Sequence, residues 1–450
     1  MNEFGYIPHT AADRKAMLET LGIERVETLF ADIPEEIRLQ GGLPLQKAMS
    51  ELDLMRHLQR LADKNQHLGK VIGFLGAGAY EHYQPSVVDA IISRSEFYTS
   101  YTPYQPEMSQ GLLQATFEYQ SMIAELTGMD LANASMYDGP TAFGEAGLVA
   151  CAHTRRNRLL VADSVHPEYC AVLETYAAGQ GVEIGYIEQK NGCLDMNALT
   201  AQLNDSIAGV LIQYPNFFGA VEDVRQIAEA AHAAGALLIV NTYPIALGLL
   251  EAPGQLGADI VVAEGQSLGN AIAYGGPYLG IMAAKQALMR KLPGRIVGQT
   301  KDQQGRRGFV LTLQAREQHI RREKATSNIC SNQSLCAIAA TVFLAYMGKQ
   351  GMRELALQNY HKAHYLKQSL VQLPGVEALF TSPFFNEFVI RLPQPVASVQ
   401  KRLLDQGFLF GYDLGKSHPQ LGDAVLLNAT EVRTKDEMDA MVEALREVLA

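Results

Sequence analysis

The sequence predicts an α/β protein with a mostly parallel sheet in a large domain, followed by a smaller α+β domain. Three observations carry this prediction. Short apolar runs alternate with helix-like stretches through the middle of the chain. These runs lack the polar–apolar alternation of half-exposed strands, so we expect them to be buried on both faces. With 450 residues, the chain is also too long for one hydrophobic core.

Residues 1–65 are predicted to form an N-terminal helical arm. Helical periodicity runs through "ERVETLFADI" and "LDLMRHLQRLADK", and the glycines and proline of "LQGGLPLQ" interrupt it. We therefore expect short helices rather than one long one.

Residues 66–325 are predicted to form the large domain. Strands are expected at "NRLLVAD", "VEIGYI", "AGVLIQYP", "ALLIVN" and "ADIVVAEG", and helices at "HPEYCAVLETYAAG", "DMNALTAQL" and "EDVRQIAEAAHAAG". Parallel strands need crossover connections, and helices between them supply these while covering the sheet.

Residues 326–450 are predicted to form the small domain. The expected order is a helix at "MRELALQNYHKAHYLKQSLVQL", two strands, a helix at "VASVQKRLLDQG", a strand at "AVLLNAT" and a last helix at "KDEMDAMVEALREVL". Thr434 and Glu437 have the spacing of a capping box at the start of that last helix.

Composition excludes several classes of protein. A net charge of −11 argues against nucleic-acid binding, which relies on excess lysine and arginine. No apolar run approaches the roughly 20 residues of a membrane span, and "MNEFGYIPHTAADRK" lacks the features of a signal peptide. We therefore expect a cytoplasmic protein without membrane or nucleic-acid partners.

The cysteines do not form a recognisable metal or disulfide pattern. There are five, at 151, 170, 193, 330 and 336, and none has CxxC spacing. No histidine pair has metal-ligand spacing either, so we expect reduced thiols and no metal site.

The stretch "KVIGFLGAGAYEHY" partly matches a dinucleotide-binding turn. Gly73, Gly76 and Gly78 follow an apolar run, but Glu81 stands where the third glycine of the fingerprint belongs. This departure favours a tight glycine turn over nucleotide binding.

A second polar turn, in "NASMYDGPTAFGEAG", precedes an alanine-rich helix. Asn133, Ser135, Asp138 and Gly139 stand where the first N–H groups of that helix are unsatisfied. Two interpretations remain open: a simple N-cap, or a site for an anion at the positive end of the helix. His166 is most simply a surface or cap residue.

The stretch "GADIVVAEGQSLGNAIAYGGPYLG", residues 257–280, has the form of a catalytic pocket floor. An apolar strand leads into a polar turn and then into glycines that permit close approach of the backbone. However, this stretch contains no lysine, histidine or cysteine.

Blocks along nearly the whole chain resemble a known family. "YTPYQPEMSQG", "LTGMDLANASMYDG", "REQHIRREKATSNIC" and "GGPYLG" are similar to the glycine decarboxylase P proteins of the glycine cleavage system, in particular to subunit 1, or α, of the split bacterial form. The resemblance implies the aspartate-aminotransferase-like fold of pyridoxal-phosphate (PLP) enzymes, fold type I.

The resemblance also implies that this chain lacks the catalytic groups of such enzymes. The lysine that holds PLP would fall near Gln266 or Ser267, and the acid that pairs with the ring nitrogen would fall at Asn241. No lysine occurs between Lys190 and Lys285. We therefore expect no catalytic residue on this chain alone, with PLP held by the partner. The candidate residues of a vestigial cofactor pocket are Ser135, Asp138, Gly139, His166 and Asn241.

The function implied is that of the α subunit of an enzyme completed by a homologous PLP-binding β subunit, as an α2β2 assembly. Glycine would lose its carboxylate as carbon dioxide, and the aminomethyl group would pass to the lipoyl arm of the H protein. Two alternatives remain: a self-sufficient PLP enzyme that uses a distant lysine, or a purely structural or regulatory partner subunit.

Residues in "FYTSYTPYQPEMSQG" are candidates for contact with the partner's site. Pro103 and Pro106 bar a regular helix. A polyproline II segment would place Tyr98, Tyr101 and Tyr104 along one edge, and Gln105 lies beside them. They either contact a substrate or cofactor group, or simply pack at a dimer interface.

A basic segment is the candidate docking surface for the H protein. Residues 285–324 contain 11 lysines and arginines and 3 acids, a net charge of 11 − 3 = +8. Arg306 and Arg307 would attract an acidic lipoyl carrier. The alternative is a solvated segment that balances acidic surface elsewhere.

Overall fold

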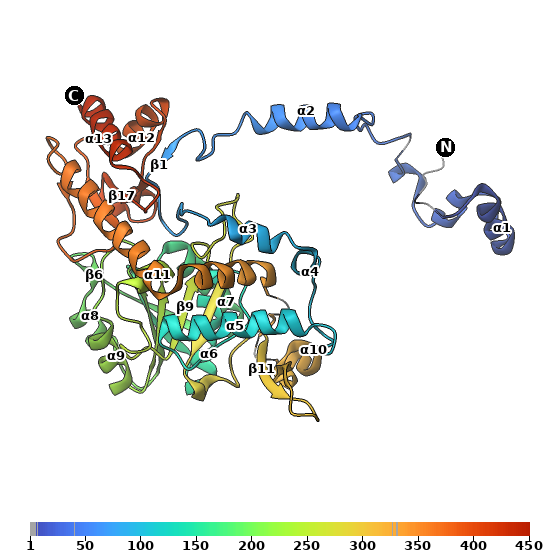
Figure 1. Cartoon of the computed structure of the whole chain (residues 1–450), viewed down its shortest axis with the longest axis horizontal. Coiled ribbons are helices and arrows are strands. Elements are labelled where there is room, and N and C mark those ends of the chain that lie inside the picture. Colours follow the sequence, from blue (N-terminus) through green and yellow to red (C-terminus); the bar gives the residue numbers. More distant parts are fainter. Residues whose placement is uncertain (1–5, 7, 40, 326, 330–331) are drawn as a thin grey trace. The chain divides into compact units, whose positions relative to one another are not determined.

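The computed structural model describes residues 6, 8–39, 41–325, 327–329 and 332–450 (Figure 1). The chain divides into two compact units, Met1–Gln66 and His67–Ala450. We describe each unit by itself.

The first unit consists of short helices, as the sequence predicts for the arm. They are α1 (Ala11–Leu21), η1 (Val26–Phe30), η2 (Glu35–Ile37) and α2 (Glu51–Ala62), and none buries a residue. Thr10 caps α1 in a capping box with Asp13, and Gly22 ends this helix with a left-handed φ of 66°. Local capping therefore fixes where these helices begin and end.

The main sheet of the described residues has seven strands in the order β2-β10-β9-β8-β7-β3-β4. Strands β9, β8, β7, β3 and β4 are parallel, and β10 is antiparallel to both β9 and β2. Nearly every residue of β7 and β8 is buried, so both faces of the sheet are covered. This is the α/β architecture that the sequence predicts. The strands are β2 (Leu131–Ala132), β3 (Arg158–Ala162), β4 (Glu183–Ile187), β7 (Ile207–Tyr214), β8 (Leu237–Thr242), β9 (Ile260–Glu264) and β10 (Gly280–Ala284).

The helices of this region owe their places to their apolar faces. Helix α9 buries Val224, Ile227, Ala228 and Ala231, the spacing of a single helical face, against β7 and β8. Helix α6 is apolar on most sides and packs on both the sheet and α7. The helices of this region are α3 (Ser86–Ile92), α4 (Ser95–Tyr98), α5 (Gln110–Thr127), α6 (Gly139–Thr154), α7 (Pro167–Gln180), α8 (Met196–Gln202), α9 (Val224–Ala233), α10 (Gln318–Arg321), and the short η3 (Pro244–Gly248), η4 (Gln286–Leu288), η5 (Gln314–Arg316) and η6 (Arg322–Lys324).

The C-terminal part of the second unit has its own hydrophobic core. An antiparallel sheet, ordered β13-β14-β17-β16, packs with helices α12 and α13. Thr434 and Glu437 form the predicted capping box of α13. The elements are β13 (Glu377–Ala378), β14 (Glu387–Arg391), α12 (Val396–Asp405), β15 (Phe408–Leu409), β16 (Tyr412–Asp413), η7 (Leu414–Lys416), η8 (Pro419–Leu421), β17 (Ala424–Asn428) and α13 (Lys435–Leu449).

A segment from early in the chain joins this second core. Strand β1 (Ile72–Gly73) pairs in parallel with β15, and Phe74 is fully buried in the C-terminal core. Residues 72–74, expected in the large domain, therefore pack with C-terminal elements. The division at 325/326 into a large and a small domain stays a prediction, because both parts belong to one compact unit.

Helix α11 (Ser334–Leu370) links the two cores. Its first half buries residues in the core of the main sheet, while Leu366 and Leu370 lie in the C-terminal core. Gly348, with φ 58°, breaks it into two helical segments. By length and composition this helix is apolar enough to cross a membrane, but a core helix meets the same test. Its burial in two cores accounts for its apolar character.

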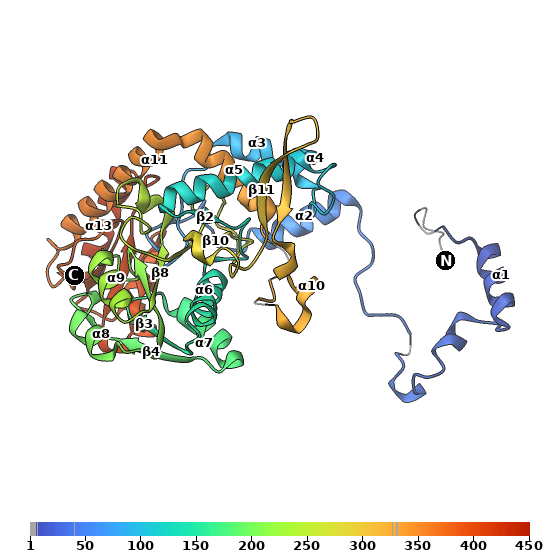
Figure 2. The same cartoon turned by 90° about the horizontal axis from the view of Figure 1, so that it is seen from below.

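Two hairpins project from these layers. β11 (Ile296–Lys301) and β12 (Arg307–Thr312) pair in antiparallel register, and Figure 2 shows their turn extending away from the sheet. The other hairpin joins β5 (Gln189–Lys190) and β6 (Cys193–Leu194).

Candidate functional site

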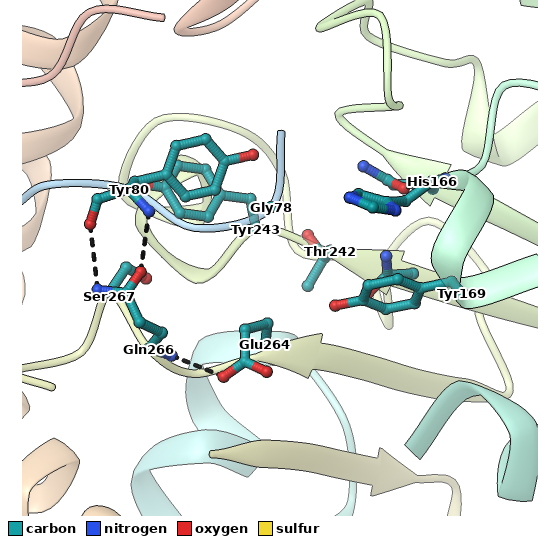
Figure 3. Close-up of a pocket in the computed structure, with 11 residues that line it drawn as sticks. Gly78, Tyr80, His166, Tyr169, Thr242, Tyr243, Glu264, Gln266 and Ser267 are labelled. Carbon is teal, nitrogen blue, oxygen red and sulfur yellow. Dashed lines mark hydrogen bonds between the residues drawn. The ribbon is translucent and has the colours of Figure 1, made fainter. Parts of the chain in front are cut away.

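A small pocket lies at the carboxyl ends of β7, β8 and β9, where ligands bind in parallel α/β sheets (Figure 3). Its volume is about 30 Å³, which is room for one or two water molecules. The residues that line it are Gly78, Tyr80, His166, Tyr169, Gln213, Asn241, Thr242, Tyr243, Glu264, Gln266 and Ser267.

Gln266, one of the two predicted lysine positions, closes the pocket. Its side-chain carbonyl accepts the N–H of Tyr80 at 2.9 Å, and its amide donates to the Tyr80 carbonyl at 3.1 Å and to that of Asn270 at 2.8 Å. Ser267, the other position, is buried, and its hydroxyl has no partner within the described chain. Neither side chain has the primary amine that is needed to form a Schiff base with an aldehyde cofactor.

Glu264, at the end of β9, also lines the pocket. One carboxylate oxygen accepts the N–H of Gly139, and the other accepts the N–H groups of Gln266 and Leu279, all at 3.0 Å. Burial raises the pKa of Glu264 to about 7, although these hydrogen bonds oppose the shift. Our sequence analysis does not predict a role for Glu264, although an acid at the end of an otherwise apolar strand is a signal for one.

The N-terminus of α6 is satisfied by the chain itself. Asp138 is the N-cap and accepts the N–H of Thr141 at 2.8 Å, while Glu264 takes the N–H of Gly139. A β-carbon at Gly139 would lie 2.1 Å from the hydroxyl of Tyr169, so only glycine fits there. The simple N-cap interpretation is therefore confirmed, and carboxylates of the chain already occupy the anion position.

His166 lines the pocket and also caps α7. Its Nδ1 accepts the N–H of Glu168 at 3.1 Å, and its Nε2 lies 2.9 Å from the carbonyl oxygen of Ala77. This arrangement requires a proton on Nε2 and none on Nδ1. Burial lowers the pKa of His166, which favours the same neutral form.

The other two predicted pocket residues differ in their placement. Asn241 lines the pocket, and its side-chain carbonyl has no hydrogen-bond partner within the described chain. Ser135 is not among the lining residues; with φ 140°, its hydroxyl turns to accept the N–H of Gln333. Asn241 therefore borders this pocket and Ser135 does not, and the roles of both in a vestigial cofactor pocket stay predictions.

The pocket is covered by residues 76–84, which sequence reasoning did not connect to it. Tyr80 donates its hydroxyl to Glu387 at 2.8 Å, and the N–H of Ala77 binds the same carboxylate at 2.7 Å. A β-carbon at Gly76 would lie 2.3 Å from an oxygen of Glu387. The glycines of the predicted tight turn therefore allow close approach to Glu387.

Contacts of His82 and Tyr83 fix the C-terminal end of residues 76–84. His82 binds Glu431 through Nδ1 at 2.7 Å and contacts the hydroxyl of Tyr243 through Nε2. The N–H of Tyr83 binds the other oxygen of Glu431 at 2.7 Å. Residues 76–84 are thus held by Gln266 on the sheet side and by two carboxylates of the C-terminal core.

The residues present do not fit PLP. The pocket lacks a lysine, and the helix N-terminus that would receive a phosphate already binds Glu264. No step of chemistry is therefore assigned to a cofactor in this chain.

Comparison with known proteins identifies the family. The glycine cleavage system P-protein family matches residues 5–445. The chain belongs to this family. It is 56% identical over 445 residues to a probable glycine dehydrogenase (decarboxylating) subunit 1 of Moorella thermoacetica, covering 99% of this chain and 100% of that one. A crystal structure of glycine decarboxylase (P-protein) in inhibitor-bound form matches with a TM-score of 0.90 and 44% identity, covering 99% and 100% of the two chains.

A more distant likeness concerns the fold alone. Glutamate decarboxylase of Lactobacillus brevis matches with a TM-score of 0.69 at 14% identity, over 92% of this chain and 96% of that one. This P-protein chain therefore shares the α/β fold of fold type I PLP enzymes, and it groups with subunit 1 of glycine dehydrogenase (decarboxylating).

The tyrosines that we expect to contact the partner subunit are exposed to solvent. The exposed fractions of Tyr98, Tyr101 and Tyr104 are 69%, 78% and 65%. The predicted single polyproline edge is wrong, because Tyr98 lies in α4 and the N–H of Tyr104 bonds back to the carbonyl of Thr102 in a tight turn. Gln105 is exposed beside them.

The predicted docking arginines lie at the turn of the β11–β12 hairpin. Arg306 is 77% exposed and pairs with Asp302 at 2.7 Å, while the guanidinium of Arg307 lies 5.5 Å from the ring of Phe309. Asp302 partly neutralises Arg306, which leaves Arg307 as the more available charge.

Four of the five cysteines lie in the described residues. Cys151, Cys170, Cys193 and Cys336 are free, and Cys330 lies outside the described residues. Over the described ranges, no group of three or more His, Cys, Asp or Glu residues could hold a metal ion.

Proposed function

We propose that this chain is the α subunit of a glycine decarboxylase, with an aspartate-aminotransferase-like fold but no cofactor of its own. The observation that carries the proposal is the mutual pairing of Gln266 and Tyr80 across the place where a cofactor would lie. Together with Glu264 at the N-terminus of α6, this pairing leaves about 30 Å³. A homologous, lysine-bearing β subunit supplies the reactive site in an α2β2 assembly.

The partner's PLP supplies an electron sink for the charge left when glycine loses its carboxylate. This chain contributes surface rather than reagents. The exposed tyrosines 101 and 104, with Gln105, face the partner, where a phenol can donate a hydrogen bond to a bound oxyanion. The basic hairpin around Arg307 steers the acidic, lipoylated H protein that accepts the aminomethyl group. Assembly in the cytoplasm remains an expectation from the sequence.

The proposal is tested by separating the two subunits. After incubation with PLP and removal of the unbound cofactor, we expect the purified chain to be colourless and to release no carbon dioxide from glycine. Mixing it with the β subunit should produce decarboxylation. Borohydride reduction followed by peptide mapping should place the modified lysine on the partner only.

Two outcomes would contradict this assignment. A cofactor-modified lysine in this chain would instead indicate a self-sufficient PLP enzyme. Full decarboxylation and aminomethyl transfer by the β subunit alone would reduce this chain to a structural or regulatory partner.

A further inference from the structure

A second cavity, separate from the pocket above, lies between the start of β11, helix α5 and the start of α11. Its volume is about 230 Å³. The lining residues do not overlap with those of the smaller pocket; they include residues 100–103, Thr116, Ala134, Arg295, Val297, Leu311, Asn332, Ser334 and Leu335. This volume suits a molecule of about amino-acid size rather than a drug-sized ligand.

Arg295 is the charged residue of this cavity. Only 6% of its surface is exposed, and within the described residues its guanidinium makes one hydrogen bond, to the neutral Asn332 side chain at 3.3 Å. The ring of Tyr104 lies 5.8 Å from the guanidinium carbon. Among the described residues, no carboxylate lies within 4.0 Å of it. A buried cation without a counter-charge is costly.

Arg433 provides the comparison within the same chain. It is also 6% exposed, but its guanidinium contacts Glu81 at 2.8 Å and Glu437 at 3.9 Å. The two arginines are equally buried, yet only Arg433 has its counter-charge in the described part of the chain. The guanidinium of Arg295 instead faces the cavity, where a bound molecule can supply the counter-charge.

Hydroxyl groups around the cavity are available to the same ligand. The side chains of Thr102 and Ser334 have no hydrogen-bond partner in the part of the chain that the structure describes. Tyr101, at the rim, is 78% exposed. A guanidinium with nearby hydroxyl donors matches the geometry of a carboxylate or a phosphate group.

We infer that this cavity is an oxyanion site, in which Arg295 binds the carboxylate or phosphate group of a small molecule. The inference rests on the cavity of this chain and not on the proposed function. Its failure would therefore leave the subunit assignment untouched.

The test uses inorganic phosphate and glycine as separate probes of the full chain, at constant ionic strength with chloride. We expect a saturable rise in melting temperature with at least one probe. Phosphate stabilises many proteins without saturating, so saturation is the diagnostic. A response to phosphate alone would identify a phosphate group as the ligand, and a response to glycine alone a carboxylate.

Matched variants separate binding from a structural role. Arg295→Gln should abolish the saturable response and leave the melting temperature of the ligand-free chain unchanged or raised. Arg433→Gln should keep the response and lower the melting temperature, because Glu81 loses its partner.

A second variant tests the cavity with its charge intact. Thr116→Met extends a side chain from α5 into the cavity and should weaken binding at least tenfold. The inference is overturned if neither probe gives a saturable shift, or if Arg295→Gln responds as the unmodified chain does.

Discussion

Gln266 binds both backbone groups of Tyr80, accepting its N–H at 2.9 Å and donating to its carbonyl at 3.1 Å (Figure 3). The residue at the predicted lysine position is therefore a buried clamp between the sheet and residues 76–84. We propose that this clamp, in addition to the missing amine, keeps PLP from binding to this chain.

Gln266→Leu should destabilise the chain. It leaves the N–H and carbonyl of Tyr80 unpaired in a buried site, at about 1–3 kcal/mol for each group. Urea denaturation measures the loss. Gln350→Leu, an exposed glutamine on α11 that bonds only Glu354, is the control and should change stability little. Equal effects of the two variants would mean that the clamp is not structurally important.

Restoring a lysine should not restore cofactor binding. In Ser267→Lys, Gln266 still pairs with Tyr80, and the N–H of Gly139 stays bound to Glu264. After incubation with PLP and removal of the unbound cofactor, we expect no absorbance from bound PLP, and no labelled residue 267 after borohydride reduction. A labelled residue 267 would show that the clamp opens readily.

Glu264 should make stability depend on pH. Burial raises the pKa of Glu264 from 4.5 to about 7 in the folded chain. As the pH rises, this carboxyl group therefore ionises in the unfolded chain before it ionises in the folded one. The contribution of Glu264 to the free energy of unfolding is fully present below pH 4.5 and is lost as the pH rises through about 7. The total loss is up to about 3 kcal/mol. Glu264→Gln should reduce the slope of unfolding free energy against pH in this range.

The slope of unfolding free energy against pH separates the effect of the raised pKa of Glu264 from the effect of its lost hydrogen bonds. The amide of Glu264→Gln cannot accept all three N–H groups, so the variant should be less stable at pH 4.5 even though its slope is smaller. Glu229→Gln, on the exposed side of α9, is the control and should leave the slope unchanged. An unaltered slope in Glu264→Gln would contradict the raised pKa.

Tyr101→Phe should lower the activity of the assembled enzyme. If the phenol orients a bound oxyanion, kcat falls by about a hundredfold, the scale of one removed donor, while assembly persists. Tyr346→Phe, a tyrosine on α11 that is 64% exposed, serves as the control. Unchanged turnover in Tyr101→Phe would leave this residue a packing role.

Reversing the charges of Arg306 and Arg307 should weaken the encounter with the H protein. In the double variant to glutamate, the apparent KM for H protein should rise and its salt dependence should flatten, with no change in the KM for glycine. Arg225→Glu, an exposed arginine paired with Glu251, is the control. A salt slope equal to that of the unmodified enzyme would place the docking surface elsewhere.

The strands of the main sheet were predictable because their signal is local. The residues of β3, β7 and β8 are apolar on both faces, which only a covered sheet explains. The capping box at Thr434 was likewise readable from two residues three positions apart. The absence of a lysine from the pocket floor required only the printed sequence.

What could not be predicted depends on contacts between distant residues. Glu387 binds Ala77 and Tyr80 across more than 300 positions, and no periodicity in either segment indicates the other. Ser135 does not line the pocket, and its hydroxyl accepts the N–H of Gln333, 198 positions further along the chain. The lack of a counter-charge at Arg295 is a property of its surroundings, not of its sequence neighbours.

The three hydrogen bonds of Glu264 have a consequence for the history of this chain. A return to cofactor chemistry would need changes at Glu264, Gln266 and Ser267 together, and replacing Glu264 alone leaves the N–H groups of Gly139, Gln266 and Leu279 unpaired. Losing these bonds lowers stability unless a further substitution pairs the freed N–H groups. We therefore expect single substitutions alone not to turn this chain into a PLP-binding enzyme.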